Sequence, residues 1–275
     1  MSQDLTTPSY RYKLAEAKRL RRVASAAARA LGTFRVRNRL EAYDFAETVG
    51  VQHPKVLGQF AHIADVDFEA LDSRFALKPI DGSSGRGVHV LERRGERYFD
   101  LLRGVTWSPI EVVGRFIDYQ LTHKLPSTVI VEEVLPPTPD TNSFTPDKWR
   151  LHCFGGTTRL IVRRSRSTDD RRPTWRYRLW YRDWTPVELT DVVVDDSLEP
   201  ALHGTELVET GDALAAAAGS PYAVFDLFDV PTGVYLNDVT PLPDQLPVQD
   251  RALDRLMGEW WEVADAETTT EVESR

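Results

Sequence analysis

The sequence contains little that would tie the protein to a membrane or to an oxidising compartment. Its single cysteine, Cys153, excludes an intramolecular disulfide framework. No apolar run approaches the roughly 18 residues that a membrane span requires. The first ten residues, MSQDLTTPSY, hold no apolar core of a secretory signal. We therefore expect a cytoplasmic protein without a membrane span.

An excess of basic residues is also missing. Asp and Glu number 42 against 34 Lys and Arg, which gives a net charge of −8. This balance disfavours general binding to nucleic acid. Hydrophobic residues make up 41% of the 275 residues. The chain is thus long enough and apolar enough for one large domain or for two closely packed lobes.

Helical and β-rich segments follow one another in an order typical of an α+β protein. Residues 11–31 are strong helix formers with one basic face, which we interpret as solvated, although a membrane surface or an anionic partner would also suit it. A second helix is predicted over residues 39–49. From Arg74 onward, short β-rich runs predict antiparallel hairpins, with helices at 108–121 and 204–218 packed on them.

The segment FALKPIDGSSGRG joins a lysine to a glycine-rich loop. Lys78 lies late on a predicted strand, and Gly82, Gly85 and Gly87 follow in a loop before the next strand. Glycines let the backbone approach a phosphate closely, so consecutive N–H groups can cradle it while the lysine supplies a positive charge. Because the lysine comes first and a strand follows, the segment is neither a P-loop nor a Rossmann turn. A plain hairpin with a flexible glycine turn explains the same residues equally well.

Two aspartates lie within apolar strands late in the chain, in AVFDLFDVPTGVYLNDVTPLP. If Pro231, Thr232 and Gly233 form a three-residue turn, the strands pair so that Asp226 and Asp238 face each other. Opposed carboxylates repel, which favours a cation between them, and Mg²⁺ prefers such oxygen ligands. A four-residue turn would instead place the two carboxylates on opposite faces, as ordinary solvated groups.

Two further segments carry weaker signals. The strand VIVEEVL ends in Glu132 and Glu133, and such a segment can offer backbone groups to an adenine ring, although solvated glutamates at a strand end are more common. Between Arg150 and Arg182, arginines alternate with aromatic residues, a composition that can bind single-stranded nucleic acid or clamp phosphates and carboxylates. The arginines at alternating strand positions share one face, which could line a cleft.

In chain order, these motifs resemble the TupA-like branch of the ATP-grasp superfamily, named for teichuronopeptide biosynthesis. The resemblance runs from about Asn38 to Pro243. It is carried by the early helix start at Asn38, by FALKPIDGSSGRG, by VEEVL, by LHCFGG and by the hairpin VFD…LNDVT. The resemblance implies an ATP-grasp fold, in which two α+β lobes with antiparallel sheets enclose a nucleotide cleft.

This resemblance also suggests how the chain is divided. Residues 1–37 would form a basic helical segment, and residues 38–262 the ATP-grasp domain. Within that domain we expect a smaller lobe with the nucleotide flap at about 70–135 and a metal-binding lobe at about 136–262. Residues 263–275 are polar and acidic, which predicts a disordered tail.

The resemblance further implies a role for each site residue. Lys78 and Arg150 would act on the phosphate that is transferred, and Asp226 with Asp238 would hold Mg²⁺. The ATP-binding residues would be Arg39, Lys78, Gly82, Ser83, Ser84, Gly85, Glu132, Glu133 and Leu135.

The implied activity is that of an ATP- and Mg²⁺-dependent carboxylate–amine ligase with an acyl-phosphate intermediate, acting in cell-envelope polymer or peptide-like metabolite biosynthesis. Two alternatives stay open: an ATP-grasp kinase that phosphorylates a sugar or another small molecule, and a non-catalytic module that binds an anionic polymer. The region before residue 38 is short for an ATP-grasp ligase. Two interpretations of this short region stay open: part of the acceptor site is missing, or a second copy of the chain or a partner subunit supplies it.

Overall fold

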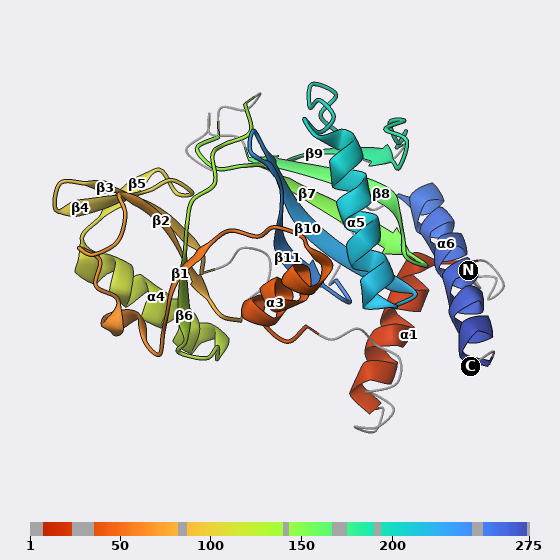
Figure 1. Ribbon diagram of the computed structural model, residues 1–275, viewed down its shortest axis with the longest axis horizontal. Helices are drawn as coiled ribbons and strands as arrows, with labels where there is room; N and C mark the ends of the chain where they lie inside the picture. The colour runs from red at the N-terminus through yellow and green to blue at the C-terminus, as the bar shows by residue number, and fades with distance from the viewer. Residues whose placement is uncertain are drawn as a thin grey trace.

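Two antiparallel β-sheets, one in each of two lobes, form the framework of the molecule (Figure 1). The computed structural model describes residues 8–23, 36–81, 87–139, 143–166, 175–189, 194–243 and 250–273. Helices pack on the outer faces of both sheets, which confirms the predicted α+β class. None of the described helices is long and apolar enough to span a membrane.

The smaller lobe contains a six-stranded sheet with the strand order β1-β6-β2-β3-β4-β5. Its strands are β1 (Val56–Phe60), β2 (Arg74–Pro79), β3 (His89–Arg94), β4 (Arg97–Asp100), β5 (Val105–Trp107) and β6 (Val129–Glu132). A short 3-10 helix, η1 (Ile63–Asp65), follows β1. The sheet begins at Val56, before the predicted lobe start at about residue 70, because β1 pairs with β6 at its edge.

Helix α4 (Pro109–His123) covers one face of this sheet. Ser108 caps its N-terminus and forms a capping box with Glu111, and a proline occupies the first helical position. Val112 and Phe116 of α4 pack with Phe75 and other buried residues of the strands. Because strand side chains alternate between the two faces, Ala76 and Lys78 point to the opposite face, away from α4.

The larger lobe contains a five-stranded sheet with the order β11-β10-β7-β8-β9. Its strands are β7 (Lys148–Phe154), β8 (Thr157–Arg166), β9 (Trp175–Tyr181), β10 (Tyr222–Val230) and β11 (Gly233–Thr240). Helices α3 (Arg39–Val49) and α5 (Gly204–Ala218) cover one face, and both begin and end where the sequence predicts. A glycine in the left-handed conformation follows each of them, at Gly50 and Gly219.

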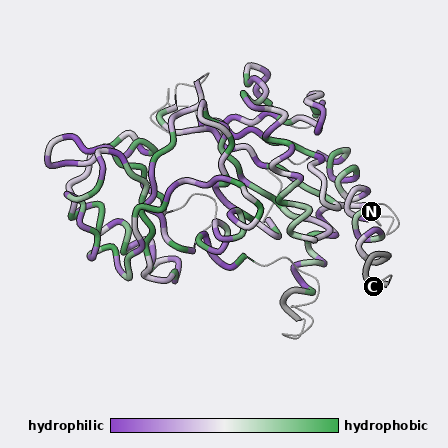
Figure 2. The backbone as a smooth tube through the Cα atoms, in the orientation of Figure 1, coloured by the Kyte–Doolittle hydropathy of each residue, from purple (hydrophilic) through white to green (hydrophobic). Residues whose placement is uncertain are grey.

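Among the described residues, helices cover only one end of the opposite face of the larger sheet. Helices α1 (Tyr10–Val23) and α6 (Arg251–Glu273) lie against its far end, where their side chains pack with Phe154, Leu160 and Val224. The near end of this face carries Lys148 and Arg150 and turns toward the smaller lobe (Figure 1). Figure 2 shows hydrophobic residues along the strands of both lobes, whereas the tip between β3 and β4 is hydrophilic.

The C-terminal segment differs from its prediction. We expected residues 263–275 to be disordered, but α6 continues to Glu273. The apolar positions Trp261 and Ala264 explain this, because both are buried against the sheet and α1. Lys13 of α1 also forms an ion pair with Asp265, at 3.0 Å. An acidic, threonine-rich composition therefore did not prevent a helix with one buried side.

Candidate active site

A cleft of about 750 Å³ lies between the two sheets. The smaller lobe contributes Ala76, Lys78 and Val90 to its lining, and the larger lobe contributes charged residues of β7, β8, β10 and β11. The cleft side chains follow from strand alternation, since their neighbours in sequence point into the hydrophobic cores under α4 and α5. One wall is thus largely apolar and the other strongly charged.

Asp226 and Asp238 lie directly opposite each other on β10 and β11, as predicted. The turn, however, is shorter than we expected, because Val230 pairs with Gly233. A β-bulge restores the register: Asp226 pairs with Asp238 and Leu227 with Leu236, which leaves Asn237 as the extra residue. The two carboxylates therefore come together through the bulge and not through a three-residue turn.

Arginines flank both carboxylates. Arg150 is the β7 partner of Asp226 and donates two hydrogen bonds to it, from Nε to Oδ1 at 2.7 Å and from Nη2 to Oδ2 at 2.8 Å. Arg39 at the start of α3 lies 3.6 Å from Asp238 and donates a 2.7 Å hydrogen bond to the carbonyl of Asn237. Burial opposes the ionisation of Asp226, but Arg150 outweighs it and lowers the pKa of Asp226 to about 2.

Arg39 and Arg150 neutralise part of the charge for which we expected a metal ion. The facing carboxylates led us to expect a cation between them, and the protein itself supplies positive charge on both sides. Repulsion between Asp226 and Asp238 therefore does not by itself require Mg²⁺. Within the parts of the chain that the structure describes, no three His, Cys, Asp or Glu residues gather in a metal-binding group.

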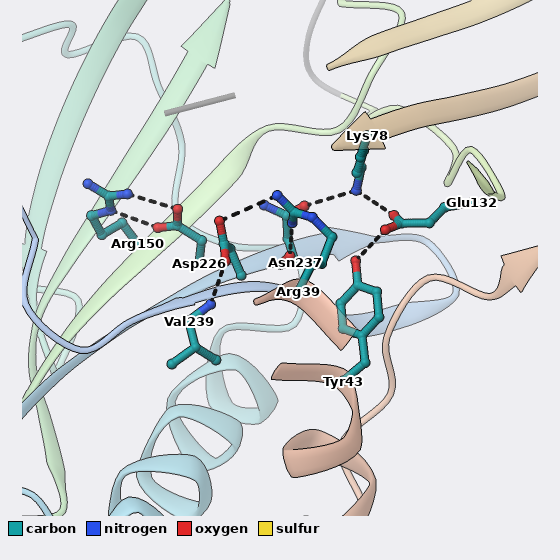
Figure 3. Close-up of polar contacts among 9 residues, drawn as sticks. Arg39, Tyr43, Lys78, Glu132, Arg150, Asp226, Asn237 and Val239 are labelled. Atoms are coloured by element: carbon teal, nitrogen blue, oxygen red, sulfur yellow. Dashed lines mark hydrogen bonds and ion pairs between the residues drawn. The ribbon is translucent and has the colours of Figure 1, made fainter. Parts of the chain in front are cut away.

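Lys78 links the two lobes across the back of the cleft (Figure 3). Its Nζ forms an ion pair with Glu132 on β6 and lies 3.5 Å from Oδ1 of Asn237 on β11. Tyr43 of α3 donates a 2.9 Å hydrogen bond to the other oxygen of Glu132. Burial lowers the pKa of Lys78, and the Glu132 carboxylate opposes that shift.

The residues expected around the adenine ring separate into two groups. Glu133 and Leu135 line the cleft. Glu132 does not, because its carboxylate is fully buried and turned toward Lys78. The predicted flap residues Gly82, Ser83, Ser84 and Gly85 lie outside the described residues.

Three site residues escaped the sequence analysis. Asn237 and Tyr43 enter the site through a bulge and a helix, neither of which leaves a motif in the sequence. Lys148 was detectable, since it lies two positions before Arg150 on the same strand and therefore on the same face. Burial lowers the pKa of Lys148 to about 8, although Asp226 and Asp238 oppose this shift.

Comparisons with known proteins agree with this architecture. The model of the TupA-like ATPgrasp family matches residues 18–262. The D-alanine–D-alanine ligase from Bacillus anthracis has a similar structure, with a TM-score of 0.51 and 14% identity over 86% of this chain and 68% of that chain. No curated protein sequence matches the chain.

Two other ligases have similar structures. The VanG D-Ala:D-Ser ligase from Enterococcus faecalis gives a TM-score of 0.52 and 14% identity over 83% of this chain and 60% of that chain. The ATP-grasp ligase PsnB, complexed with a phosphomimetic variant of its minimal precursor, Mg and ADP, gives a TM-score of 0.50 and 15% identity. The match covers 84% of this chain and 58% of that chain. At these identities the likeness concerns the fold, and the chain spans 58–68% of the lengths of these three proteins.

Proposed function

Because the chain belongs to the TupA-like ATP-grasp family, we propose that it is an ATP- and Mg²⁺-dependent carboxylate–amine ligase. Its small-molecule product would enter a cell-envelope polymer or a peptide-like metabolite. The proposal is carried by one observation: Lys78 of the smaller lobe and the Arg150–Asp226 pair of the larger lobe line the same cleft. This arrangement gives positive charge on both walls, with the carboxylates of Asp226 and Asp238 on the wall of the larger lobe, which suits a nucleotide with its cation.

The two aspartates fit a cation that arrives with the nucleotide. Mg²⁺ is usually held by one or two carboxylates together with substrate phosphates and water, so a larger protein cage is not needed. Asp238 is the more accessible ligand, with 24% of its side chain exposed, against 6% for Asp226. When bound, the ion would neutralise charge on the phosphates. Asp238 would be its main protein ligand, and Asp226 would share its oxygens with Arg150.

The proposed reaction has two steps. A carboxylate oxygen of the first substrate attacks the γ-phosphorus of ATP, the bond from that phosphorus to the β-phosphate oxygen breaks, and ADP leaves. The amine of the second substrate then attacks the acyl carbon, inorganic phosphate leaves with the bonding electrons, and the nitrogen loses a proton to give an amide. Both steps need fixed positive charge near oxygen rather than a protein nucleophile.

Several side chains would supply that positive charge. Lys78, which already lines the cleft, would contact the α- and β-phosphates. Arg150 would hold the transferred phosphate while its other hydrogen bonds fix the position of Asp226. Glu133 and Leu135 would lie against the adenine, and Gly82 to Gly85 would form the flap. Arg39 would stabilise the loop at Asn237 and the adjacent phosphates.

Isotope transfer tests the ligase directly. The protein is incubated with Mg²⁺, ATP and a panel of amino acids, each offered with ¹⁸O in its carboxylate. An acyl phosphate carries one of these oxygens into the released inorganic phosphate, which mass spectrometry detects together with the amide product. A stable phosphorylated product without free phosphate would instead identify a kinase. Salt-sensitive polymer binding without ATP turnover would identify a binding module.

A matched pair of lysine variants tests whether the reaction takes place in the cleft. Lys78→Met should abolish turnover, whereas Lys124→Met, at the exposed C-terminal cap of α4, should keep it. Turnover that survives in a folded Lys78→Met protein would contradict the assignment of this cleft as the active site.

A further inference from the structure

The cleft continues beyond the Arg150–Asp226 pair onto β8 and β9. Arg164 and Arg166 of β8 and Trp175 and Tyr177 of β9 line this extension. Strand pairing places them together, with Arg164 opposite Tyr177 and Arg166 opposite Trp175. Arg164 also pairs with Lys148 on β7, so the extension adjoins the proposed phosphate site. We call Arg164, Arg166, Trp175 and Tyr177 the arginine subsite.

The arginines of this subsite differ from their neighbours on the other face of the sheet. Arg163 forms an ion pair with Asp147 at 2.8 Å, and Arg176 with Asp195 at 3.1 Å. Within the described residues, neither Arg164 nor Arg166 forms an ion pair with a carboxylate. On these two strands, Arg163 and Arg176, which turn away from the cleft, are thus paired, whereas Arg164 and Arg166 lack a carboxylate partner among the described residues.

Aromatic rings and like charges surround the two unpaired guanidinium groups. Arg164 lies 5.0 Å from the ring centre of Trp175 and 5.6 Å from that of Tyr177, and its buried Nε has no hydrogen-bond partner among the described residues. Burial and the nearby Arg103 lower the pKa of Arg166, and the carboxylate of Asp100 only partly opposes them. Asp100 is itself in an ion pair with Arg103. Positive charge therefore gathers here without a matching anion in the described chain.

An anionic ligand would resolve this imbalance. A guanidinium group binds a carboxylate or a phosphate through two parallel hydrogen bonds, and the open face of Trp175, of which 43% is exposed, offers a surface for a planar or aliphatic stem. Arg164 lies two strands from Asp226 and two residues further along, which at about 4.8 Å per strand and about 3.3 Å per residue is a separation of about 12 Å. A small molecule can span that distance.

We propose that one substrate carries a second anionic group, besides the carboxylate that is activated, and that Arg164 and Arg166 bind this group beside Trp175. The proposal rests on the proposed ligase function, because that function places the activated carboxylate near Arg150. The substrate is then a dianion, which is either a dicarboxylate or a carboxylate that also carries a phosphate. A neutral amino acid is excluded.

Matched acid and amide ligands test the proposal. The probes are glutamate with glutamine, aspartate with asparagine, and O-phosphoserine with serine, each titrated calorimetrically in the presence of Mg²⁺ and a non-hydrolysable ATP analogue. Hydrogen bonds to a charged group are stronger than those to a neutral one, so at least one acid should bind about 10-fold more tightly than its neutral partner. The phosphate pair and the carboxylate pairs distinguish the two sources of the anion.

Three arginine variants test whether the preference for the acid ligand depends on the arginine subsite. Arg164→Gln and Arg166→Gln should each remove the preference for the acid, whereas Arg159→Gln, which removes an exposed charge from the same strand outside the cleft lining, should keep it. The ATP analogue should bind all three variants as it binds the wild type. The proposal is overturned if no acid is preferred, if the preference survives in both cleft variants, or if these variants lose the nucleotide instead. Failure of the wild type to bind the analogue would refute the ligase function separately.

Discussion

Arg150 lies directly opposite Asp226 on the neighbouring strand and binds both of its carboxylate oxygens. From the sequence alone we expected the opposed carboxylates of Asp226 and Asp238 to repel each other. The structure adds an ion pair that stabilises the charge of Asp226. Asp226 is the charge partner of a mostly buried arginine, and its removal leaves that arginine unpaired.

The first prediction therefore concerns the stability of Asp226→Asn in the absence of Mg²⁺. We expect it to lower the free energy of unfolding by about 3 kcal/mol, because breaking a buried ion pair from one side leaves an uncompensated charge. Asp238→Asn should cost less than about 1 kcal/mol, since its partner Arg39 is 3.6 Å away and its side chain is more exposed. Urea unfolding in EDTA measures both. Equal stability of Asp226→Asn and wild type would contradict the ion pair.

The second prediction follows from the pKa of Asp226, which is about 2 in the folded protein against an ordinary value of 3.8. A lowered carboxyl pKa stabilises the fold above the unfolded value, and this contribution is lost as the pH falls from about 3.8 to about 2. The stability difference between wild type and Asp226→Asn should therefore be constant above pH 5 and shrink below pH 4. Unfolding free energies measured from pH 3 to 7 check the sign. A difference that grows on acidification would contradict it.

The third prediction concerns the buried pair of Lys78 and Glu132. Lys78→Met should lower the unfolding free energy by about 3–5 kcal/mol, because Glu132 has no exposed surface and would lose its counter-charge. The double variant Lys78→Met with Glu132→Gln should recover most of this stability without recovering the binding of Mg²⁺-ATP. Urea unfolding and nucleotide titration of the two variants separate the roles. If the double variant binds the nucleotide like the wild type, Lys78 is a structural residue only.

The Lys78–Glu132 pair shows which parts of the site could be predicted from the sequence and which could not. The glycine-rich loop after Lys78 was the signal that indicated a phosphate site, because the strand itself shows no alternation and is buried from Phe75 to Pro79. Its partner is 54 residues away, and only the pairing of β2 with β6 brings the two together. Glu132 was therefore assigned to the adenine pocket from its motif, while its neighbour Glu133 is the one that lines the cleft.

Local turn geometry limited the prediction of the aspartate site. The facing of Asp226 and Asp238 was predicted correctly, but from a turn that the hairpin does not have. A bulge at Asn237 shifts the register by one residue and cancels the error in turn length. Bulges depend on contacts across the fold, here the hydrogen bond from Arg39 to the carbonyl of Asn237. Contacts across the fold also explain the last helix, α6, where the composition predicted disorder. Its buried contacts are with α1, at the other end of the chain.

The last prediction concerns Lys148, which lies in the cleft between the Arg150–Asp226 pair and the arginine subsite. Burial lowers its pKa to about 8 in the ligand-free protein, against about 10.4 for an ordinary lysine. Competitive acylation with an amine-reactive reagent, followed by peptide mass spectrometry, should therefore give a titration midpoint near pH 8 for Lys148. The exposed Lys124 serves as the internal reference.

Ligands should move this midpoint in a defined direction. Phosphates near Lys148 favour its charged form, so the Mg²⁺ complex of a non-hydrolysable ATP analogue should raise the midpoint and slow acylation at pH 8. The pH dependence of stability has the same sign as for Asp226, because folding lowers both pKa values. Between pH 8 and about 10.4 the unfolded chain keeps a proton that the folded chain has lost, so the unfolding free energy rises with pH in this window. Lys148→Met should remove that rise. If Lys148 instead titrates together with Lys124 and does not respond to the nucleotide, its ammonium group is solvated and contributes nothing to the phosphate site.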